Sequence, residues 1–587
     1  MPLARQRRWT VRIAPLPICA AICLIAYSAG RGGPAGAAPW YSIVPPLVAV
    51  GMALATNRVF PSLGVGVVVG GLLHAGGSSS AGLWWPLTGL ADAARCVGQS
   101  VWPASGDPAH LQILLLVVLM MAMVSVTLVG GGLHGVAQWL ARYARSPQST
   151  QFVTVLMGLA VFFDDYANTM IVGPTMRPLS DRQRVSREKL AFIVDATAAP
   201  VAGIALVSTW IGYEVGLLGK TADSLGLAKD GYAMFLDAVG FRYYCLGMIA
   251  FMVANALSGE DFAAMAGAER RARQLGKPLD DGARPLTTRA FTAVQPHPRA
   301  RVLARVGIVP VLCLLLAFLG GMWATGGGWA AFAADRLAPL RISVWREALN
   351  QADNNLLLTV AAAFGLLVAV LMTLAVSRAP APAAAKAMLL GARSSLLPIA
   401  ILVMAWSLTE TCGALGTGPF LASILVGSLP PAIYPPLVFV VACLISFATG
   451  TSWGTMAILI PTALPVAFQL DGQSYGLVTM ISIAAVLDGA IFGDHCSPIS
   501  DTTILSSAAS SCDHLAHVRT QLPYSLLVAG LALSIGYVPA ALGVPCWVGS
   551  LGSAAVSAVL FLGLWLFRRR PHGLPAVGPY QGERTGE

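Results

Sequence analysis

The sequence predicts an all-α polytopic membrane protein with about 12 transmembrane helices, two re-entrant hairpins and paired broken helices in inverted-topology repeats. Three observations lead to this prediction. Of the 587 residues, 56% are hydrophobic and only 11% are charged, whereas an ordinary soluble domain is about 25% charged. Apolar runs of about 17–25 residues, long enough to cross a bilayer, recur along the chain. Five aspartates nevertheless fall within apolar stretches: Asp164, Asp165, Asp195, Asp488 and Asp494.

Positive charge marks the side of the membrane on which the loops lie. The net charge is +10, and arginine and lysine gather in short loops and at the two ends, at residues 5–12, 177–189 and 568–570. The positive-inside rule accounts for such clusters as orientation signals, so they require no nucleic-acid partner. Both termini are therefore predicted to be cytoplasmic.

Four spanning helices are predicted before the first hairpin: residues 13–29, 41–56, 59–76 and 111–131. The first of them follows several arginines, as a signal peptide would, but a retained helix is the preferred interpretation. The topology of the later segments is the same in either case.

The first hairpin is predicted at residues 150–176. Its apolar run is broken by Asp164 and Asp165, and positive loops flank both of its ends. A segment with cytoplasmic loops at both ends cannot cross once, so it must enter the membrane and return, with the two aspartates near its tip. The next crossing, residues 188–218, contains Ala198-Ala-Pro-Val-Ala-Gly203. It is predicted to unwind at mid-membrane because proline removes a helix hydrogen bond.

A helix at residues 233–256 completes the N-terminal half, 1–256, and the arginine-rich stretch 257–302 is predicted to be a cytoplasmic linker. The C-terminal half, 303–587, repeats the arrangement in the opposite orientation. Its predicted elements are spanning helices at 303–325, 354–377 and 393–412, a second hairpin at 434–468, a helix at 477–509 that is broken at Gly493-Asp-His-Cys-Ser-Pro498, and spanning helices at 521–542 and 548–567. The loops beside the second hairpin carry no lysine or arginine, so this hairpin is expected to enter from the external side.

A faint internal repeat supports two inverted halves. Short motifs match in order: Asn168-Thr-Met170 and Pro174-Thr175 with Gly454-Thr-Met456 and Pro461-Thr462, and Asp195 before Pro200 with Asp488 before Pro498. Inverted repeats with paired broken helices place a binding site near the bilayer midplane.

The intramembrane aspartates are the candidate ion-binding residues. A carboxylate at the bilayer centre costs about 2.5–3.5 kcal/mol on insertion scales, so several of them indicate a use. Asp164 and Asp165 are adjacent, and two neighbouring carboxylates titrate as a unit that can hold a proton or a metal cation. Transported sodium, not a structural metal, is expected at Asp164, Asp165, Asp195, Asp488 and Asp494. The alternative is that Asp164 and Asp165 cap the returning helix.

Oxygen-bearing side chains at the breaks extend the predicted site, because hard cations prefer oxygen ligands. They are Asn168, Thr169, Thr197, Ser208, Thr209, Thr451, Ser452 and Ser497. His495 is either a proton carrier or a hydrogen-bonded structural histidine. Asp501 is either part of the site or the cap of a helix that starts near Ser500.

Other charged residues are expected to lie outside the site. Glu214, Glu410 and Asp237 lie near the ends of their segments and are expected to reach interfacial water. No arginine or lysine is expected at the breaks to bind an organic carboxylate. The ten cysteines lie singly with no Cys-x-x-Cys motif, and neither a zinc site nor any cofactor is expected.

Seven motifs occur in order along the chain: Phe162-Phe-Asp-Asp-Tyr-Ala-Asn168, Ile171-Val-Gly-Pro-Thr-Met-Arg-Pro178, Ser186-Arg-Glu-Lys-Leu190, Val194-Asp-Ala-Thr-Ala-Ala-Pro-Val201, Ser208-Thr-Trp-Ile-Gly212, Gly450-Thr-Ser-Trp-Gly-Thr455 and Gly493-Asp-His-Cys-Ser-Pro-Ile-Ser-Asp-Thr-Thr503. Together they resemble the NhaC family of sodium/proton antiporters. The resemblance covers residues 151–214 and 449–511, and outside them only the hydropathy is similar.

The resemblance implies a multi-pass secondary transporter of the bacterial inner (cytoplasmic) membrane. It would exchange sodium, or another monovalent cation, for protons by alternating access. Some members of the family resemble sodium-driven exchangers of malate and lactate, so the alternative is a sodium-coupled transporter of an organic anion or amino acid. Membrane lipid is the expected environment, and a homodimer is left open.

An enzyme is not expected. An intramembrane aspartyl protease would need a GxGD motif, and Ile491-Phe-Gly-Asp494 lacks its first glycine. No HExxH motif of a metalloprotease occurs either.

Overall fold

The fold is described from a computed structural model that covers residues 39–56, 58–77, 85–101, 108–227, 229–285, 296–417, 420 and 429–569. Within these ranges every regular element is a helix, and an isolated β-bridge joins Pro285 to Asp513. Nine of the described helices are long and apolar enough to cross a membrane. The predicted all-α membrane architecture is confirmed at this level. The helix predicted at 13–29 lies outside the described residues.

The helices up to the linker are η1 (Trp40–Ile43), α3 (Val44–Thr56), α4 (Val59–Gly77), α5 (Trp85–Val101), α6 (Ala109–Val129), α7 (Gly132–Ala141), α8 (Pro147–Ala160), α9 (Asp165–Arg182), α10 (Arg187–Ala196), α11 (Ala199–Ala202), α12 (Ile211–Ser224), α13 (Gly231–Val239), α14 (Tyr243–Ser258) and α15 (Ala263–Leu275). Those after it are α17 (Ala304–Thr325), α18 (Gly328–Ala334), η3 (Ala338–Leu340), α19 (Ile342–Gln351), α20 (Asn354–Leu371), η4 (Met372–Val376), α21 (Ala381–Ser394), α22 (Leu396–Leu415), η5 (Pro431–Ile433), α24 (Tyr434–Thr449), α25 (Ser452–Leu470), α26 (Leu477–Cys496), α27 (Asp501–Ala509), α28 (His514–Leu531), η6 (Ala532–Tyr537), α29 (Val538–Ala541) and α30 (Cys546–Arg569).

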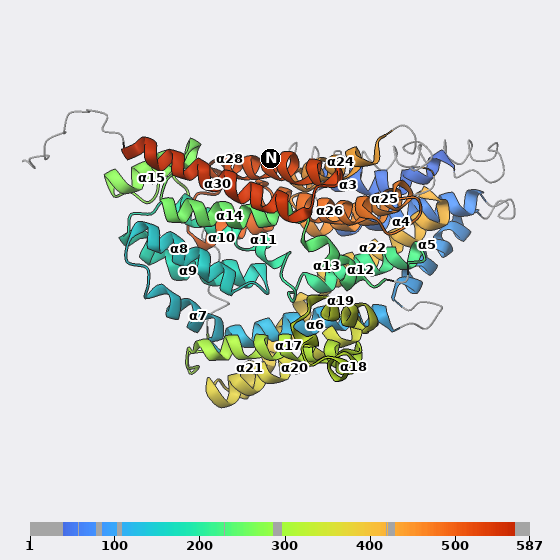
Figure 1. The fold of residues 1–587 in the computed structure, drawn as a ribbon, viewed down its shortest axis with the longest axis horizontal. Coiled ribbons are helices and arrows are strands. Elements are labelled where there is room, and N and C mark those ends of the chain that lie inside the picture. The colour runs from blue at the N-terminus through green and yellow to red at the C-terminus, as the bar shows by residue number, and fades with distance from the viewer. Residues whose placement is uncertain are drawn as a thin grey trace, which may run out of the picture.

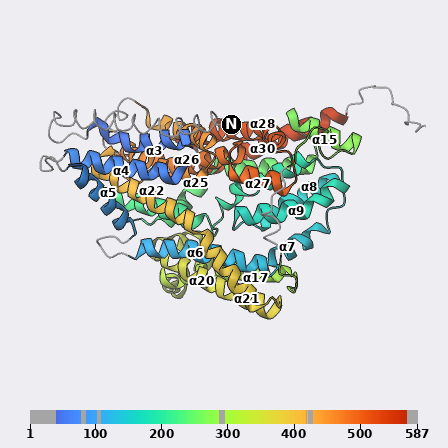
Figure 2. The same ribbon diagram turned by 180° about the vertical axis from the view of Figure 1, so that it is seen from behind.

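Helices from distant parts of the sequence pack side by side. Most long helices run along the long axis of the molecule, and α6 packs with α17, α20 and α21 in the lower layer of Figure 1. The opposite layer contains α28 and α30 together with α14, α24 and α26. Seen from behind, α3, α4 and α5 lie at one end of the molecule and α8 and α9 at the other (Figure 2). Each layer therefore contains helices from both predicted halves of the chain.

The helix α26 is almost entirely buried, and its glycines explain how α24 packs against it. A Cβ on Gly493 would lie 2.2 Å from the backbone nitrogen of Phe447, and one on Gly489 would lie 2.5 Å from the Cβ of Ala442. In lipid, where apolar surface alone does not drive helices together, small residues permit this close van der Waals packing. The packing holds Asp494, next to Gly493, against the second hairpin.

The first predicted hairpin corresponds to α8 and α9. Ser146 caps α8 in a capping box, and Pro147 occupies the first helical position, where its missing N–H has no intrahelical partner to lose. Residues 161–164 separate the two helices. The turn therefore ends on Asp164, which precedes the first residue of α9.

The second predicted hairpin corresponds to α24 and α25, and its turn has the shape of the first. Thr451, which precedes α25, has φ −150° and ψ 125°, close to the φ −157° and ψ 125° of Asp164 before α9. The internal prolines of the two helices also correspond. Pro174 and Pro178 of α9 lie 287 positions before Pro461 and Pro465 of α25, which is also the offset between the capping residues Asp164 and Thr451.

This offset corrects the register of the predicted repeat. Asn168-Thr-Met170 stands opposite Thr455-Met-Ala457, one position away from the predicted match. Asp195 and Asp488 are not counterparts either, because Asp195 lies one residue before the end of α10 and Asp488 lies eight residues before the end of α26. Asp494, two residues before the same end, is the closer counterpart.

The predicted breaks in the two long helices are present, but their extents differ from the prediction. α10 ends at Ala196, the short α11 follows, and the chain stays irregular until α12 begins at Ile211. α26 continues to Cys496 and α27 begins at Asp501, so the second break falls at residues 497–500. It begins later than predicted because the glycines at the end of α26 stay helical against α24.

The helix predicted at 233–256 is interrupted, which the sequence prediction missed. α13 and α14 are bent by 46° relative to each other. Arg242 stands at the start of α14 and is fully buried. The first turn of α14 has free backbone N–H groups, and the N–H of Tyr244 donates to the carboxylate of Asp488 at 2.7 Å. A distant carboxylate thus stabilises a helix start inside the segment.

The predicted linker, over its described residues 257–285, packs against neighbouring helices. α15 contacts α10 and α28. Lys189 of α10 pairs with Asp261, and Arg271 of α15 donates to both carboxylate oxygens of Glu188 at 2.8 Å. This part of the linker is therefore fixed to the helix that leads into the first break.

Candidate functional site

Asp164 joins the tip of the first hairpin to the first helix break. Its Oδ1 accepts the backbone N–H of Ala167 at 2.6 Å, and its Oδ2 accepts the hydroxyl of Thr209 at 2.9 Å. The N–H of Thr209 also donates to the carbonyl of Phe163 at 2.8 Å. Asp164 is thus the N-cap of α9, but the cap uses only one carboxylate oxygen. The other oxygen bonds to the irregular segment that precedes α12.

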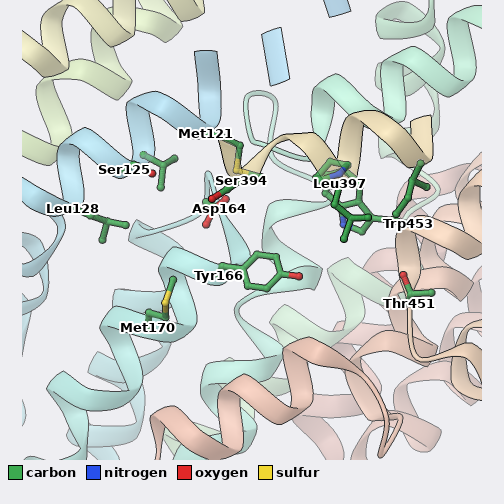
Figure 3. A pocket seen from close by; sticks show the side chains of 13 residues that line it. Met121, Ser125, Leu128, Asp164, Tyr166, Met170, Ser394, Leu397, Thr451 and Trp453 are labelled. Carbon is green, nitrogen blue, oxygen red and sulfur yellow. The ribbon is translucent and has the colours of Figure 1, made fainter. Parts of the chain in front are cut away.

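Asp164 also faces a cavity of about 430 Å³. Helices from both parts of the chain form the wall, including α6, α9, α22 and α25. In Figure 3 Asp164 and Tyr166 lie on one side of the cavity and Thr451 and Trp453 on the other. The first hairpin and the second hairpin therefore meet across one cavity.

Asn168 ties the first hairpin to the end of α10. Its amide Nδ2 donates to the carbonyls of Gly158 at 2.8 Å, Val161 at 3.3 Å and Thr197 at 2.9 Å. Its amide oxygen has no hydrogen-bond partner among the residues that the structure describes. That oxygen is available to a ligand. Asp165, at the first position of α9, is also buried.

Several predicted oxygen ligands have local structural partners. Ser208 accepts the N–H groups of Trp210 and Ile211 at 3.2 Å and so stabilises the start of α12. Thr451 caps α25, and the hydroxyl of Thr197 donates to a carbonyl one turn earlier in α10. Ser497 donates to a carbonyl of α24 at 2.7 Å, and Thr169 is buried within α9. These bonds hold the turns in place.

An aromatic cluster connects the second hairpin to α12. The rings of Trp210 and Trp453 are 5.9 Å apart with an angle of 64° between their planes, and the ring of Tyr213 lies 4.3 Å from that of Trp453. The hydroxyl of Tyr213 donates to the carbonyl of Trp453 at 2.6 Å. The start of α12 thus contacts both hairpins. Thr209, just before α12, bonds to Asp164 of the first hairpin, and Tyr213 of α12 bonds to Trp453 of the second.

Asp494, two residues before the end of α26, bonds to the second helix break in a comparable way. Its Oδ1 accepts the hydroxyl of Ser500 at 2.6 Å, and its Oδ2 accepts that of Ser452 at 3.1 Å. Ser452 is the first residue of α25, so Asp494 joins the second break to the second hairpin. Asp501 is the first residue of α27, and its side chain lies outside the described part of the structure.

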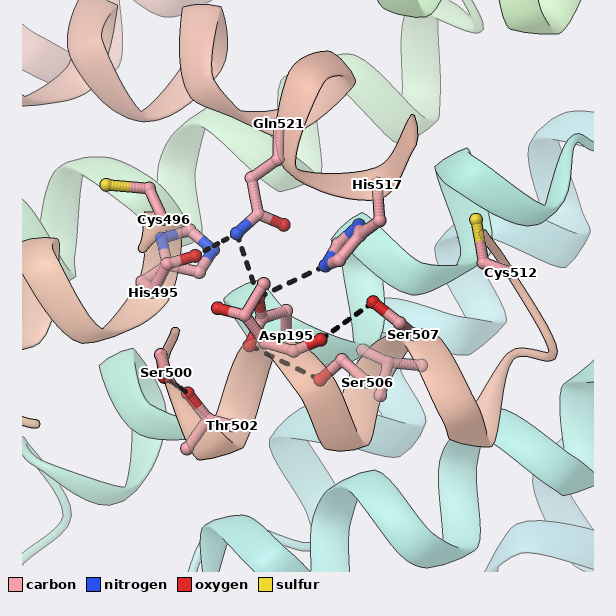
Figure 4. A network of polar contacts seen from close by, with 12 residues as sticks. Asp195, His495, Cys496, Ser500, Thr502, Ser506, Ser507, Cys512, His517 and Gln521 are labelled. Atoms are coloured by element: carbon pink, nitrogen blue, oxygen red, sulfur yellow. Dashed lines mark hydrogen bonds and ion pairs between the residues drawn. The ribbon is translucent and has the colours of Figure 1, made fainter. Parts of the chain in front are cut away.

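Asp195 belongs to a separate polar network at the end of α10 (Figure 4). Its carboxylate contacts His517 at 3.3 Å and Gln521 at 2.8 Å from α28, and Ser506 of α27 at 3.3 Å. The same Gln521 amide contacts the carbonyl of His495. The ring of His495 instead bonds to the hydroxyl of Tyr244 at 2.7 Å. The structure therefore does not gather all the predicted residues into one shell, because each aspartate has its own partners.

Asp488 lies in an ion pair that the sequence prediction missed. Its Oδ1 accepts from Arg242 Nε at 2.8 Å, and Glu214 lies on the other side of the guanidinium at 3.9 Å. Two expectations are wrong here: an arginine does stand at a break, and Glu214 is 1% exposed and does not reach water. The reason is the bend between α13 and α14, which turns Arg242 inward. A charged residue inside an apolar run was the available signal.

Two other acidic residues follow the prediction more closely. Glu410, with 38% of its side chain exposed, pairs with Lys220, and Asp237 pairs with Lys229. Both pairs lie away from the cavity-lining residues.

A family model described as the Na+/H+ antiporter family matches residues 201–542. An uncharacterized protein of Haemophilus influenzae is 29% identical over 534 residues, which are 90% of this chain and 96% of that protein. The malate-2H(+)/Na(+)-lactate antiporter of Bacillus subtilis is 34% identical over 152 residues, which are 25% of this chain and 31% of that antiporter. The match to the antiporter is thus confined to under a third of its length.

The fold is also similar to that of a solved transporter. The YdaH transporter of Alcanivorax borkumensis superimposes with a TM-score of 0.52 over 78% of this chain and 90% of its own, at 17% sequence identity. This likeness concerns the fold alone. The family match covers more than half of the chain and confirms the resemblance carried by the motifs. The chain belongs to the Na+/H+ antiporter family, whose members are integral membrane antiporters and not enzymes.

Proposed function

We propose that this protein exchanges sodium, or another monovalent cation, for protons across the bacterial cytoplasmic membrane by alternating access. The observation that carries the proposal is the position of Asp164. This carboxylate is 3% exposed, faces the cavity between the two hairpins, and bonds to the irregular segment before α12. Membership of the Na+/H+ antiporter family supports the same conclusion.

Exchange requires only that a sodium ion and a proton compete for the same carboxylate oxygens. Asp164 and Asp165 are adjacent and both buried, so ionising both without a compensating cation is costly. A bound sodium ion compensates the charge, and in its absence a proton does so. The hydroxyl of Thr209 supplies a neutral oxygen beside Asp164, and the unpartnered amide oxygen of Asn168 in the first part of α9 is a further candidate ligand. Release of the proton to one side and of the cation to the other then gives exchange.

The finer architecture forms part of the proposal. The matching backbone angles before α9 and α25 support two hairpins that are related by an inverted repeat. We place the first hairpin on the cytoplasmic side and the second on the external side, within about 12 transmembrane helices and with both termini in the cytoplasm. Asp494 with Ser452 forms the corresponding element of the second half.

The first test is cation-dependent proton flux in proteoliposomes that contain a pH-sensitive dye. We expect sodium to drive proton movement with the wild-type protein and with Asp281→Asn, which alters a carboxylate that is 80% exposed. Asp164→Asn and Asp165→Asn should each lower the flux to the level of protein-free vesicles. Unchanged exchange by both neutral variants would exclude the proposed site.

A second candidate function is sodium-coupled exchange of a small organic anion or amino acid. The cavity volume favours it, since about 430 Å³ lies within the range of small-molecule sites, about 300–1,000 Å³, and exceeds what a sodium ion needs. The name of the B. subtilis relative also includes malate and lactate. Counterflow of radiolabelled malate, lactate and arginine into preloaded vesicles tests it. Uptake that depends on sodium would establish this function, and no uptake would favour simple cation–proton exchange.

A further inference from the structure

A second buried charge cluster lies where α12, the start of α14 and α26 meet. Arg242, Asp488 and Glu214 form it, and each is at most 1% exposed. None of the three lines the cavity that Asp164 faces. Gly203, in the irregular part of the first break, permits the approach of Arg242, since a Cβ there would lie 3.1 Å from Nη2. The cluster therefore contacts both interrupted segments of the N-terminal half.

Asp488 is fully engaged as the ionised partner of Arg242. Its Oδ1 accepts from the guanidinium Nε at 2.8 Å. Its Oδ2 accepts the backbone N–H of Tyr244 at 2.7 Å and the hydroxyl of Tyr537 at 2.8 Å. Donors on both oxygens stabilise the charged carboxylate.

Glu214 has no such set of donors. Within the described residues neither of its carboxylate oxygens has a hydrogen-bond partner. Nη1 of Arg242, which lies 3.9 Å from Oε1 of Glu214, has none either. One guanidinium thus faces two carboxylates. If both were ionised, the cluster would retain a net negative charge away from water, which is strongly unfavourable. A proton on Glu214 makes the cluster neutral.

The other acidic groups on the described helices that pack against α12 have basic partners of their own. Of the helices packed against α12, α13 carries Asp237, which pairs with Lys229, and α22 carries Glu410, which pairs with Lys220. α6 carries His110, whose ring stacks on Trp406 at 4.4 Å. The described helix α25 has no ionisable side chain. The groups that face Glu214 are therefore Arg242 and Asp488, with the tyrosines that serve Asp488.

We infer that Glu214 is a proton-binding site, separate from the carboxylates at the cavity, which takes up and releases a proton during the transport cycle. This inference rests on the proposed cation–proton exchange. The site selects a proton over a metal cation because the guanidinium repels a second cation. The oxygens of Asp488 are also already bonded to Arg242, Tyr244 and Tyr537.

The first turn of α12 links this site to the cavity. The N–H of Glu214 donates to the carbonyl of Trp210 at 3.0 Å, and Thr209, just before it, donates to Asp164. A cation bound at Asp164 replaces the hydrogen bond from Thr209 by coordination to its hydroxyl oxygen, so it shifts the start of α12. A shift of Glu214 towards Arg242 then favours proton release, and a shift away favours proton uptake.

Infrared difference spectroscopy of the purified full-length protein tests the site without requiring transport. A pH jump should produce a carboxylic-acid carbonyl band that shifts in D2O, in the wild type and in Glu347→Gln, which alters an exposed glutamate on α19. The band should be absent from Glu214→Gln and displaced in frequency in Glu214→Asp. If Glu214→Gln retains every wild-type band, the inference is wrong. If that variant does not fold, an undisplaced band in Glu214→Asp excludes the site equally.

A transport measurement separates this inference from the proposed function. Glu214→Gln in proteoliposomes should move fewer protons per cation than the wild type, as measured by the imposed gradients at which net flux reverses. Asp164→Asn should abolish exchange and keep the Glu214 band. Exchange by Glu214→Gln at the wild-type proton-to-cation ratio would overturn the inference and leave the proposed function intact.

Discussion

Each intramembrane aspartate is stabilised by different partners, and these partners indicate what it can do. Asp164 accepts from a backbone N–H and a hydroxyl, and the described contacts of Asp494 include two hydroxyls. Asp195 is held by an amide, a hydroxyl and a histidine. Asp488 has the permanent charge of Arg242. The neutral partners of Asp164 leave room for an exchangeable cation, so Asp164 suits transport better than Asp488.

Asn168 provides a prediction at the scale of one side chain. Alanine at this position removes a donor shared by three carbonyls, two in the first hairpin and one at the start of the first break. We expect Asn168→Ala to lower the free energy of unfolding by about 1–3 kcal/mol, because buried acceptors lose their partner. Thermal unfolding in detergent measures the loss, with the exposed Gln274→Ala as the control. Equal stability of the two variants would show that the Asn168 amide does not hold the first hairpin to the end of α10.

The sequence alone identified site residues only where a charged side chain interrupts an apolar run. Aspartates in apolar runs are costly whatever surrounds them, so Asp164 and Asp494 could be recognised without a structure. The pairing of Arg242 with Asp488 joins positions 246 residues apart and depends on the bend before α14. No local pattern contains that information, and the same limit applies to the burial of Glu214.

At the scale of elements, the helix pairs α8–α9 and α24–α25 were predictable because polar residues and glycine interrupt their apolar runs. Their turns are alike in backbone shape but differ in chemistry: an aspartate precedes α9, and a threonine precedes α25. The first hairpin therefore supplies the charge and the second supplies neutral oxygens. The exact register of the repeat was missed because the matching motifs are short and the prolines alone fix the offset.

Gly450 tests the turn of the second hairpin. It has φ +67°, and a Cβ would lie 2.8 Å from the backbone of Ile499 in the second break. Gly472 has φ +71° with nothing within 4 Å of a Cβ, so it is a matched control. Left-handed backbone costs an alanine about 1–2 kcal/mol at either position. We expect Gly450→Ala to lower the unfolding temperature well beyond Gly472→Ala.

Equal effects of the two substitutions would contradict this packing. A further readout is sodium-dependent flux, which Gly472→Ala should leave near the wild-type level and Gly450→Ala should reduce, because Ile499 lies beside Ser500 and its bond to Asp494.

At the scale of the whole molecule, the linker fastens both parts of the chain together. Glu188 and Lys189 of α10 pair with its described residues, and the N–H of Arg284 donates to Asp513 at the start of α28 at 2.9 Å. The sequence indicated a polar linker, but these attachments depend on which helices lie nearby. Hydropathy predicts the layers of this fold better than it predicts the contacts between them.

Asp513 gives this attachment a pH dependence. Burial opposes its charge, but the N–H groups of Ala516 and Arg284 outweigh burial and lower the pKa of the carboxyl. A lowered folded-state pKa contributes stability that is present above the unfolded value, about 3.9, and is lost as the pH falls through the folded value. The wild type should therefore be more stable than Asp513→Asn at neutral pH. This advantage should shrink in acid, as followed by thermal unfolding across that range. A difference that does not vary with pH would contradict the assignment.

The central claim is that a cation and a proton compete for the carboxylates at the tip of the first hairpin. Sodium-triggered proton release from the purified protein in weakly buffered detergent, followed with a pH dye, tests it most directly. We expect release from the wild type and from Asp281→Asn, and none from Asp164→Asn. Release of the same size from Asp164→Asn would show that sodium displaces its protons elsewhere.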